Sequence, residues 1–103
     1  MVRKINAEEF AQEALTGRAV VDFSATWCGP CRMMAPVLEQ IAEEKTDVKF
    51  FNVDVDENTE LAIRYGISSI PALLVLKDGQ KQAMLIGFKP KPILEAEIGR
   101  ALS

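Results

Sequence analysis

The sequence predicts an α/β fold in which a central mixed β-sheet carries helices on both faces. Short apolar segments rich in β-branched residues alternate along the chain with segments of helical period. Near the end, Asp78-Gly79 separates two strand-like segments, which indicates a hairpin and an antiparallel part of the sheet. The predicted order is β-α-β-α-β-α-β-β-α, in one domain that takes in all 103 residues.

The first strand is expected over Val2–Ile5, followed by a helix. Asn6 can cap that helix, with Glu9 as its capping-box partner, and Gly17 ends it. An apolar stripe at helical spacing lies between these signals.

Ala19–Ala25 is nearly continuous in apolar character, which is typical of a strand buried on both faces. A helix follows from Pro30 to about Lys45, and Pro36 inside it predicts a kink. The remaining elements are expected over Val48–Val55 (strand), Glu60–Tyr65 (helix), Ala72–Leu76 and Gln82–Ile86 (hairpin), and from Pro92 onward (helix).

Composition and charge exclude several classes of function. The formal net charge is −3, from 12 basic and 15 acidic residues, and the basic residues form no stripe, so nucleic-acid binding is not expected. The longest apolar run, Ile70–Leu76, is far too short to cross a bilayer. The N-terminus has no apolar segment typical of a signal peptide, so a cytoplasmic protein is expected.

The chemistry-bearing pair is Cys28 and Cys31, at the junction of the buried strand and the following helix. We expect the helix N-terminus to stabilise a thiolate on Cys28 and so to lower the pKa of this thiol below the ordinary value of about 8.5. Such a thiolate is the nucleophile of thiol–disulfide exchange. Cys31, one turn later, is expected to point further into the protein and to resolve the intermediate.

Two other interpretations of the pair are weaker. A structural disulfide that spans two residues is a poor staple, and a reducing cytosol would open it. A structural zinc site needs four ligands, whereas the chain has two cysteines and no histidine. Only a dimer that pools four cysteines, or a copper carrier that uses two, would give a metal site, so none is expected.

Asp22 lies in the middle of a buried strand, where an unpaired charge is costly. Strand alternation places it on one face with Val20 and Ser24. Burial predicts a raised pKa, and the carboxylate can then take the proton of Cys31, directly or through water. A structural hydrogen bond is the other interpretation, and the spacing leaves both open.

The segment Asp22–Cys31, with the sequence Trp-Cys-Gly-Pro-Cys at its end and Pro36 downstream, resembles the active-site stretch of the thioredoxin family. Three later segments are similar to the family in the same order: Val53–Asp56, Tyr65–Pro71 and Lys77–Gly87. The resemblance implies the thioredoxin fold, with the strand Val48–Val55 between the first strand and Ala19–Ala25. It also implies a cis peptide bond before Pro71, facing the cysteines.

The resemblance further implies the roles of individual residues. Cys28 is the attacking thiol, Cys31 the resolving thiol and Asp22 the buried carboxyl group that assists it. The residues between the cysteines, which are Gly29 and Pro30, tune the redox potential. A shallow apolar groove for the partner's chain is lined by Trp27, Ile70, Pro71 and Gly87. The residues alone would place Trp27 and Ile70 in the core.

The function implied is that of a monomeric protein-disulfide reductase that acts on disulfide-containing proteins. No bound cofactor is needed. The resemblance implies that a thioredoxin reductase, which uses flavin and NADPH, returns the electrons. A glutaredoxin and a disulfide-isomerase-like oxidant are alternatives, and the intervening Gly-Pro favours a reductase over both. A binding module with incidental thiols is an alternative from another class.

Three positions depart from common bacterial members of the family. Asn52 stands where a lysine often lies near the buried aspartate, so one influence that lowers the pKa of Asp22 is missing. Ala72 stands in place of a frequent threonine, and Ser24 in place of a frequent tryptophan.

Overall fold

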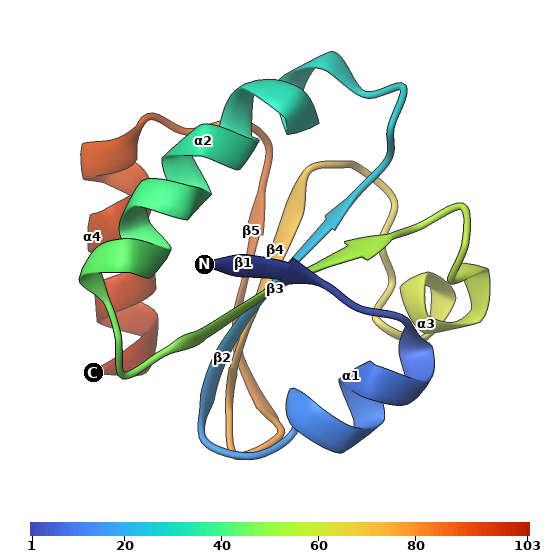
Figure 1. Ribbon diagram of the computed structural model, residues 1–103, viewed down its shortest axis with the longest axis horizontal. Helices are drawn as coiled ribbons and strands as arrows, with labels where there is room; N and C mark the ends of the chain where they lie inside the picture. The colour runs from blue at the N-terminus through green and yellow to red at the C-terminus, as the bar shows by residue number, and fades with distance from the viewer.

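The computed structural model describes residues 1–103 and contains one sheet and four helices (Figure 1). The strands are β1 (Val2–Lys4), β2 (Arg18–Ser24), β3 (Lys49–Asp54), β4 (Ala72–Lys77) and β5 (Gln80–Ile86). The helices are α1 (Ala7–Glu13), α2 (Gly29–Glu44), α3 (Thr59–Arg64) and α4 (Lys91–Leu102). None of these helices combines the length and the apolar character needed to cross a membrane.

The five strands lie in the order β1-β3-β2-β4-β5. Strand β3 is parallel to both β1 and β2, whereas β4 is antiparallel to β2 and to β5. The mixed five-stranded sheet is therefore confirmed, and so is the position of β3 between β1 and β2. This is the thioredoxin fold.

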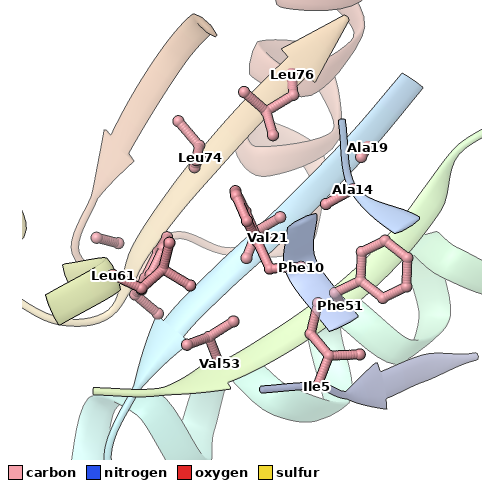
Figure 2. Packing of buried hydrophobic residues seen from close by; sticks show 12 residues of the cluster. Ile5, Phe10, Ala14, Ala19, Val21, Phe51, Val53, Leu61, Leu74 and Leu76 are labelled. Carbon is pink, nitrogen blue, oxygen red and sulfur yellow. The ribbon is translucent and has the colours of Figure 1, made fainter. Parts of the chain in front are cut away.

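One face of the sheet is covered by α1 and α3. Figure 2 shows Phe10 of α1 and Leu61 of α3 gathered with Val21, Val53 and Leu74 of the three central strands. The predicted capping box starts α1: the Asn6 side chain accepts from the Glu9 N–H at 2.8 Å, and the Glu9 carboxylate accepts from the Asn6 N–H at 3.0 Å. The cap satisfies N–H groups that would otherwise have no partner at the helix end.

The opposite face is covered by α2 and α4, which lie side by side (Figure 1). Met34 and Leu38 of α2 and Ile98 of α4 pack there against Val20 and Val75. The two clusters take alternate residues of the central strands, as a sheet buried on both faces requires.

Most predicted boundaries differ from the observed ones by one or two residues, but helix α1 ends at Glu13, well before the predicted stop at Gly17. Strand β5 begins at Gln80 rather than Gln82, because Asp78 and Gly79 alone make the turn from β4. Both have positive φ, 50° and 79°, as expected for a type I′ turn, a common connection in two-residue hairpins. Helix α2 runs on past Pro36 to Glu44, and the kink at Pro36 stays a prediction.

Candidate active site

Cys28 is the N-cap residue of α2, in the extended conformation that an N-cap requires. Its Sγ accepts a hydrogen bond from the Cys31 N–H at 3.2 Å, so the sulfur faces the free N–H groups of the first turn. Pro30 lies inside that turn, where no N–H is needed. The Cα atoms of the two cysteines are 5.3 Å apart, and the cysteines form a disulfide.

The two cysteines are almost equally buried in this disulfide state. Cys28 is 5% exposed and Cys31 4%, in a small cluster with Ala25. The exposed fractions of the whole residues do not distinguish the two cysteines, and the expectation that Cys31 points further into the protein stays a prediction. Both cysteines belong to the same tight turn, so packing against Ala25 covers both. Their position at the helix end, rather than their exposure, distinguishes them.

The segment before β4 approaches the disulfide from the other side. The peptide bond between Ile70 and Pro71 is cis, as the resemblance implied. The Ile70 carbonyl oxygen lies 4.0 Å from the Cys28 Sγ, so this segment faces the cysteines. Gly87, just after β5, donates its N–H to the Pro71 carbonyl at 2.8 Å and thereby joins the same part of the surface.

Trp27 is 67% exposed, and its indole Nε1–H donates to Asp56 Oδ2 at 2.8 Å. Ile70 is half-buried. The core position that the residues alone would give to Trp27 and Ile70 is therefore wrong. Trp27 lies in the turn that follows β2, beyond the part of the strand that both layers of helices cover.

Asp22 is buried, with an exposed fraction of only 4%. Desolvation raises the pKa of this carboxyl group to about 7, and a hydrogen bond from Asn52 opposes the shift. The bond joins Asn52 Nδ2 to Asp22 Oδ2 at 3.4 Å, and Oδ1 has no hydrogen-bond partner. The raised pKa predicted from burial is confirmed. The protein donates one long hydrogen bond to this carboxylate, and the choice between a proton acceptor and a structural hydrogen bond stays a prediction.

A cavity of about 220 Å³ reaches this carboxyl group between β1, α2 and β3. Its other lining residues are Val2, Lys4, Ala35, Leu38, Glu39 and Asn52. The cavity gives a buried group a place from which water can exchange a proton. The four residues of the predicted groove line none of the three cavities of the molecule, and the groove stays a prediction.

One contact beside the site was not predicted. The Asn52 amide also donates to Ser24 Oγ at 2.7 Å, so two of the three departures from the family pattern touch each other. The parallel register pairs Asp22 with Asn52, and Ser24 is two residues further along β2. The sequence marks each position separately, and only the register of two strands distant in sequence brings them together.

No three side chains of His, Cys, Asp or Glu gather closely enough to hold a metal ion. The redox centre consists of the chain's own cysteines. A cysteine pair that closes a disulfide across the first turn of a helix, on this fold, is the site of a thiol–disulfide oxidoreductase.

Comparison with known proteins gives the family. The thioredoxin family model matches residues 1–100. A thioredoxin of Listeria monocytogenes is 48% identical over 101 residues, which cover 97% of this chain and 98% of the relative. Thioredoxins of Bacillus subtilis and Staphylococcus aureus are 47% and 44% identical, and each alignment covers 96% of both chains. The chain belongs to the thioredoxin family.

Membership gives the activity: the chain is a protein-disulfide oxidoreductase that works through its own dithiol and disulfide without a bound cofactor. Its substrates are disulfide-containing proteins, and a reductase is its partner.

Proposed function

We propose that the chain is a reductant of protein disulfides in which Cys28 attacks and Cys31 resolves. The observation that carries this assignment is the hydrogen bond from the Cys31 N–H to the Cys28 Sγ at the start of α2. After reduction the same N–H groups face the Cys28 sulfur and stabilise its thiolate. Cys31 lies within the helix, where its own sulfur has no such position.

The exchange then takes place in two steps. The Cys28 thiolate attacks one sulfur of the substrate disulfide, forms a mixed disulfide and releases the other substrate sulfur as a thiolate. Cys31 loses its proton and attacks the Cys28 sulfur, which forms the Cys28–Cys31 disulfide and releases the second substrate thiolate. The two electrons that reduce the substrate come from the two cysteines.

Asp22 accepts the proton of Cys31 in the second step, directly or through water in the adjoining cavity. Two observations support this role: the pKa of Asp22 is raised to about 7, and Oδ1 accepts no hydrogen bond from the protein. A base whose pKa lies near neutrality is efficient at neutral pH, since it is partly ionised and can still hold a proton.

The other residues act around this centre. Gly29 and Pro30 tune the redox potential from between the cysteines. Four residues that surround the disulfide receive the partner's chain: Trp27, Ile70, Pro71 and Gly87. The exposure of Trp27 and the short distance from Ile70 to Cys28 support this surface, because a docking site needs apolar groups open to solvent.

The chain acts as one domain and as a monomer, without nucleic acid. A net charge of −3 supports the last point, because binding to phosphates needs the opposite sign. It acts in the cytoplasm, where a reductase uses electrons from NADPH to reduce the disulfide again.

The assignment of the two cysteines is tested by trapping. Cys31→Ser removes the thiol that displaces the substrate from Cys28. The variant therefore accumulates mixed disulfides between Cys28 and partner proteins. Non-reducing electrophoresis with mass spectrometry of the adducts measures this. The matched variant Cys28→Ser should trap far less. A binding module with incidental thiols predicts no adducts with either variant, and that result would overturn the proposal.

The role of Asp22 is tested by the kinetics of the two steps. Asp22→Asn keeps the size of the side chain and removes the base, so resolution should slow by roughly 10²-fold while the initial attack changes little. Rapid-mixing measurements with a fluorescent disulfide substrate separate the two rates. Equal slowing of both steps, or no slowing, would return Asp22 to a structural role.

A further inference from the structure

Ser24 and Asn52 lie against each other beside the Asp22 carboxyl group. Asn52 is the register partner of Asp22 across β2 and β3, and Ser24 is on the same face of β2 as Asp22. The Asn52 Nδ2 donates to Ser24 Oγ at 2.7 Å, to the Asp22 backbone oxygen at 3.2 Å and to Asp22 Oδ2 at 3.4 Å.

These three distances rank the acceptors. The amide nitrogen has two hydrogens for three acceptors, so at least one acceptor is served poorly. The backbone oxygen of Asp22 can only accept, which turns the NH₂ end of Asn52 toward it. The bond to Ser24 is the shortest, and the bond to the carboxylate is at the long limit of hydrogen bonding. Ser24 therefore competes with Asp22 for the Asn52 amide.

We propose that Ser24 and Asn52 are positioning residues for Asp22: Ser24 holds the Asn52 amide so that the carboxyl group keeps one long hydrogen bond and stays ready to accept a proton. The inference rests on the proposed role of Asp22 as the proton acceptor of Cys31. Ser24 and Asn52 touch neither sulfur nor substrate. They set the pH at which the second step works.

No charged side chain is hydrogen bonded to Asp22, and the Asn52 amide is the only donor of the protein to its carboxylate. The cavity is lined by Lys4 of β1, which pairs with Glu57 at 3.1 Å, and by Glu39 of α2, whose Oε1 accepts from the Val2 N–H at 2.9 Å. Neither charge is hydrogen bonded to Asp22, and β4 places apolar Leu73 opposite it. Burial and the Asn52 hydrogen bond are the influences that set the pKa of Asp22.

Two substitutions should move the pKa of Asp22 in opposite directions. Asn52→Leu removes the only donor to the carboxylate, so the pKa of Asp22 should rise above about 7. Ser24→Ala removes the competing acceptor and lets the amide turn to the carboxylate, so the pKa should fall. A hydrogen bond of ordinary strength corresponds to a shift of roughly half a unit to one unit in each case. Ser24→Thr keeps the hydroxyl group and should keep the original value.

The measurement is a titration of the ¹³C carboxyl chemical shift of Asp22 in the oxidised protein. A double variant isolates the coupling: since Ser24 acts through the amide, Ser24→Ala should cause no shift in the Asn52→Leu background. In the reduced protein, the pH at which resolution reaches half its maximal rate should move with the pKa in the same order of variants. Both side chains are only half-buried, and Asn52→Ala serves if Asn52→Leu does not fold.

Shifts in the same direction, no shifts, or an effect of Ser24→Ala that persists without Asn52 would overturn the inference. The titration does not depend on catalysis. If Asp22→Asn leaves resolution unchanged, the proposed function of Asp22 fails while the titration still reports on the pair. If Asp22→Asn slows resolution but the titration shows no opposed shifts, only the positioning role fails.

Discussion

Asp22 is the residue at which stability and function conflict. Its carboxyl group is buried in the sheet layer with one long hydrogen bond and no paired cation. Desolvation disfavours the charged form, which is why the pKa of Asp22 rises to about 7. A neutral residue at this position would fold more favourably, so packing alone does not explain the aspartate, and the proposed proton transfer would explain it.

The raised pKa predicts how stability depends on pH. Between the ordinary value of about 3.8 and about 7, the folded chain holds a proton on Asp22 that the unfolded chain has lost. The contribution of Asp22 to stability is therefore fully present below the lower pH and is lost as the pH rises through this window. Asp22→Asn should remove this loss and raise the free energy of unfolding at pH 8 by about 4 kcal/mol at most.

Urea unfolding of the oxidised protein at pH 4 and pH 8 measures the effect. The gain should be large at pH 8 and small at pH 4, where the native Asp22 is protonated in the folded state. An equal gain at both pH values would show that the pKa of Asp22 is not raised.

At this scale the sequence predicts what depends on a residue's own strand or helix. The burial of Asp22 and the position of Cys28 beside the start of the helix follow from local patterns, and both are found. The exposure of Trp27 does not follow, because an apolar side chain is more often buried and only the turn after β2 brings it to the surface. The contact between Ser24 and Asn52 depends on the register of β2 and β3, which no local pattern fixes.

Among the elements, the hairpin β4–β5 depends most visibly on a single residue. Gly79 has φ of +79°, and a Cβ there would lie 3.2 Å from the Leu15 backbone oxygen. Gly79→Ala should therefore lower the free energy of unfolding by about 1–2 kcal/mol, measured by chemical denaturation.

Gly99 in α4 provides the matched control. It has helical φ, and a Cβ there would meet nothing within 4 Å, so Gly99→Ala should instead stabilise by up to about 1 kcal/mol. Destabilisation of the same size at both positions would show that the conformation of the turn is not the cause.

The order of elements is readable from periodicity and turn residues, and except for the early end of α1 at Glu13 the ends of the elements agree with the structure to within one or two residues. The two-residue turn moves the start of β5 because Gln80 pairs directly with Lys77. Periodicity alone does not predict that β3 lies between β1 and β2, or that the peptide bond before Pro71 is cis. Both came from the family resemblance, since a strand's neighbours and a bond's isomer are tertiary properties.

At the scale of the whole molecule, the fold brings the segment before β4 to the disulfide that follows β2. Strand β2 carries Asp22, the start of α2 carries both cysteines, and the segment before β4 brings Ile70 and Pro71 to the disulfide. Helices cover both faces of the sheet, and Trp27 is exposed in the turn after β2. The two cysteines follow directly after this turn, so the disulfide lies beside an exposed side chain although the cysteines themselves are buried.

The central claim is that the helix N-terminus makes the Cys28 sulfur the reactive one. The most direct measurement is the rate at which iodoacetamide alkylates each cysteine of the reduced protein between pH 5 and pH 9, with the modified residue identified by mass spectrometry. Cys28 should react first, and its rate should reach half its maximum clearly below the free-cysteine value of about pH 8.5. A half-maximum at or above that pH, or equal rates for Cys28 and Cys31, would contradict the account.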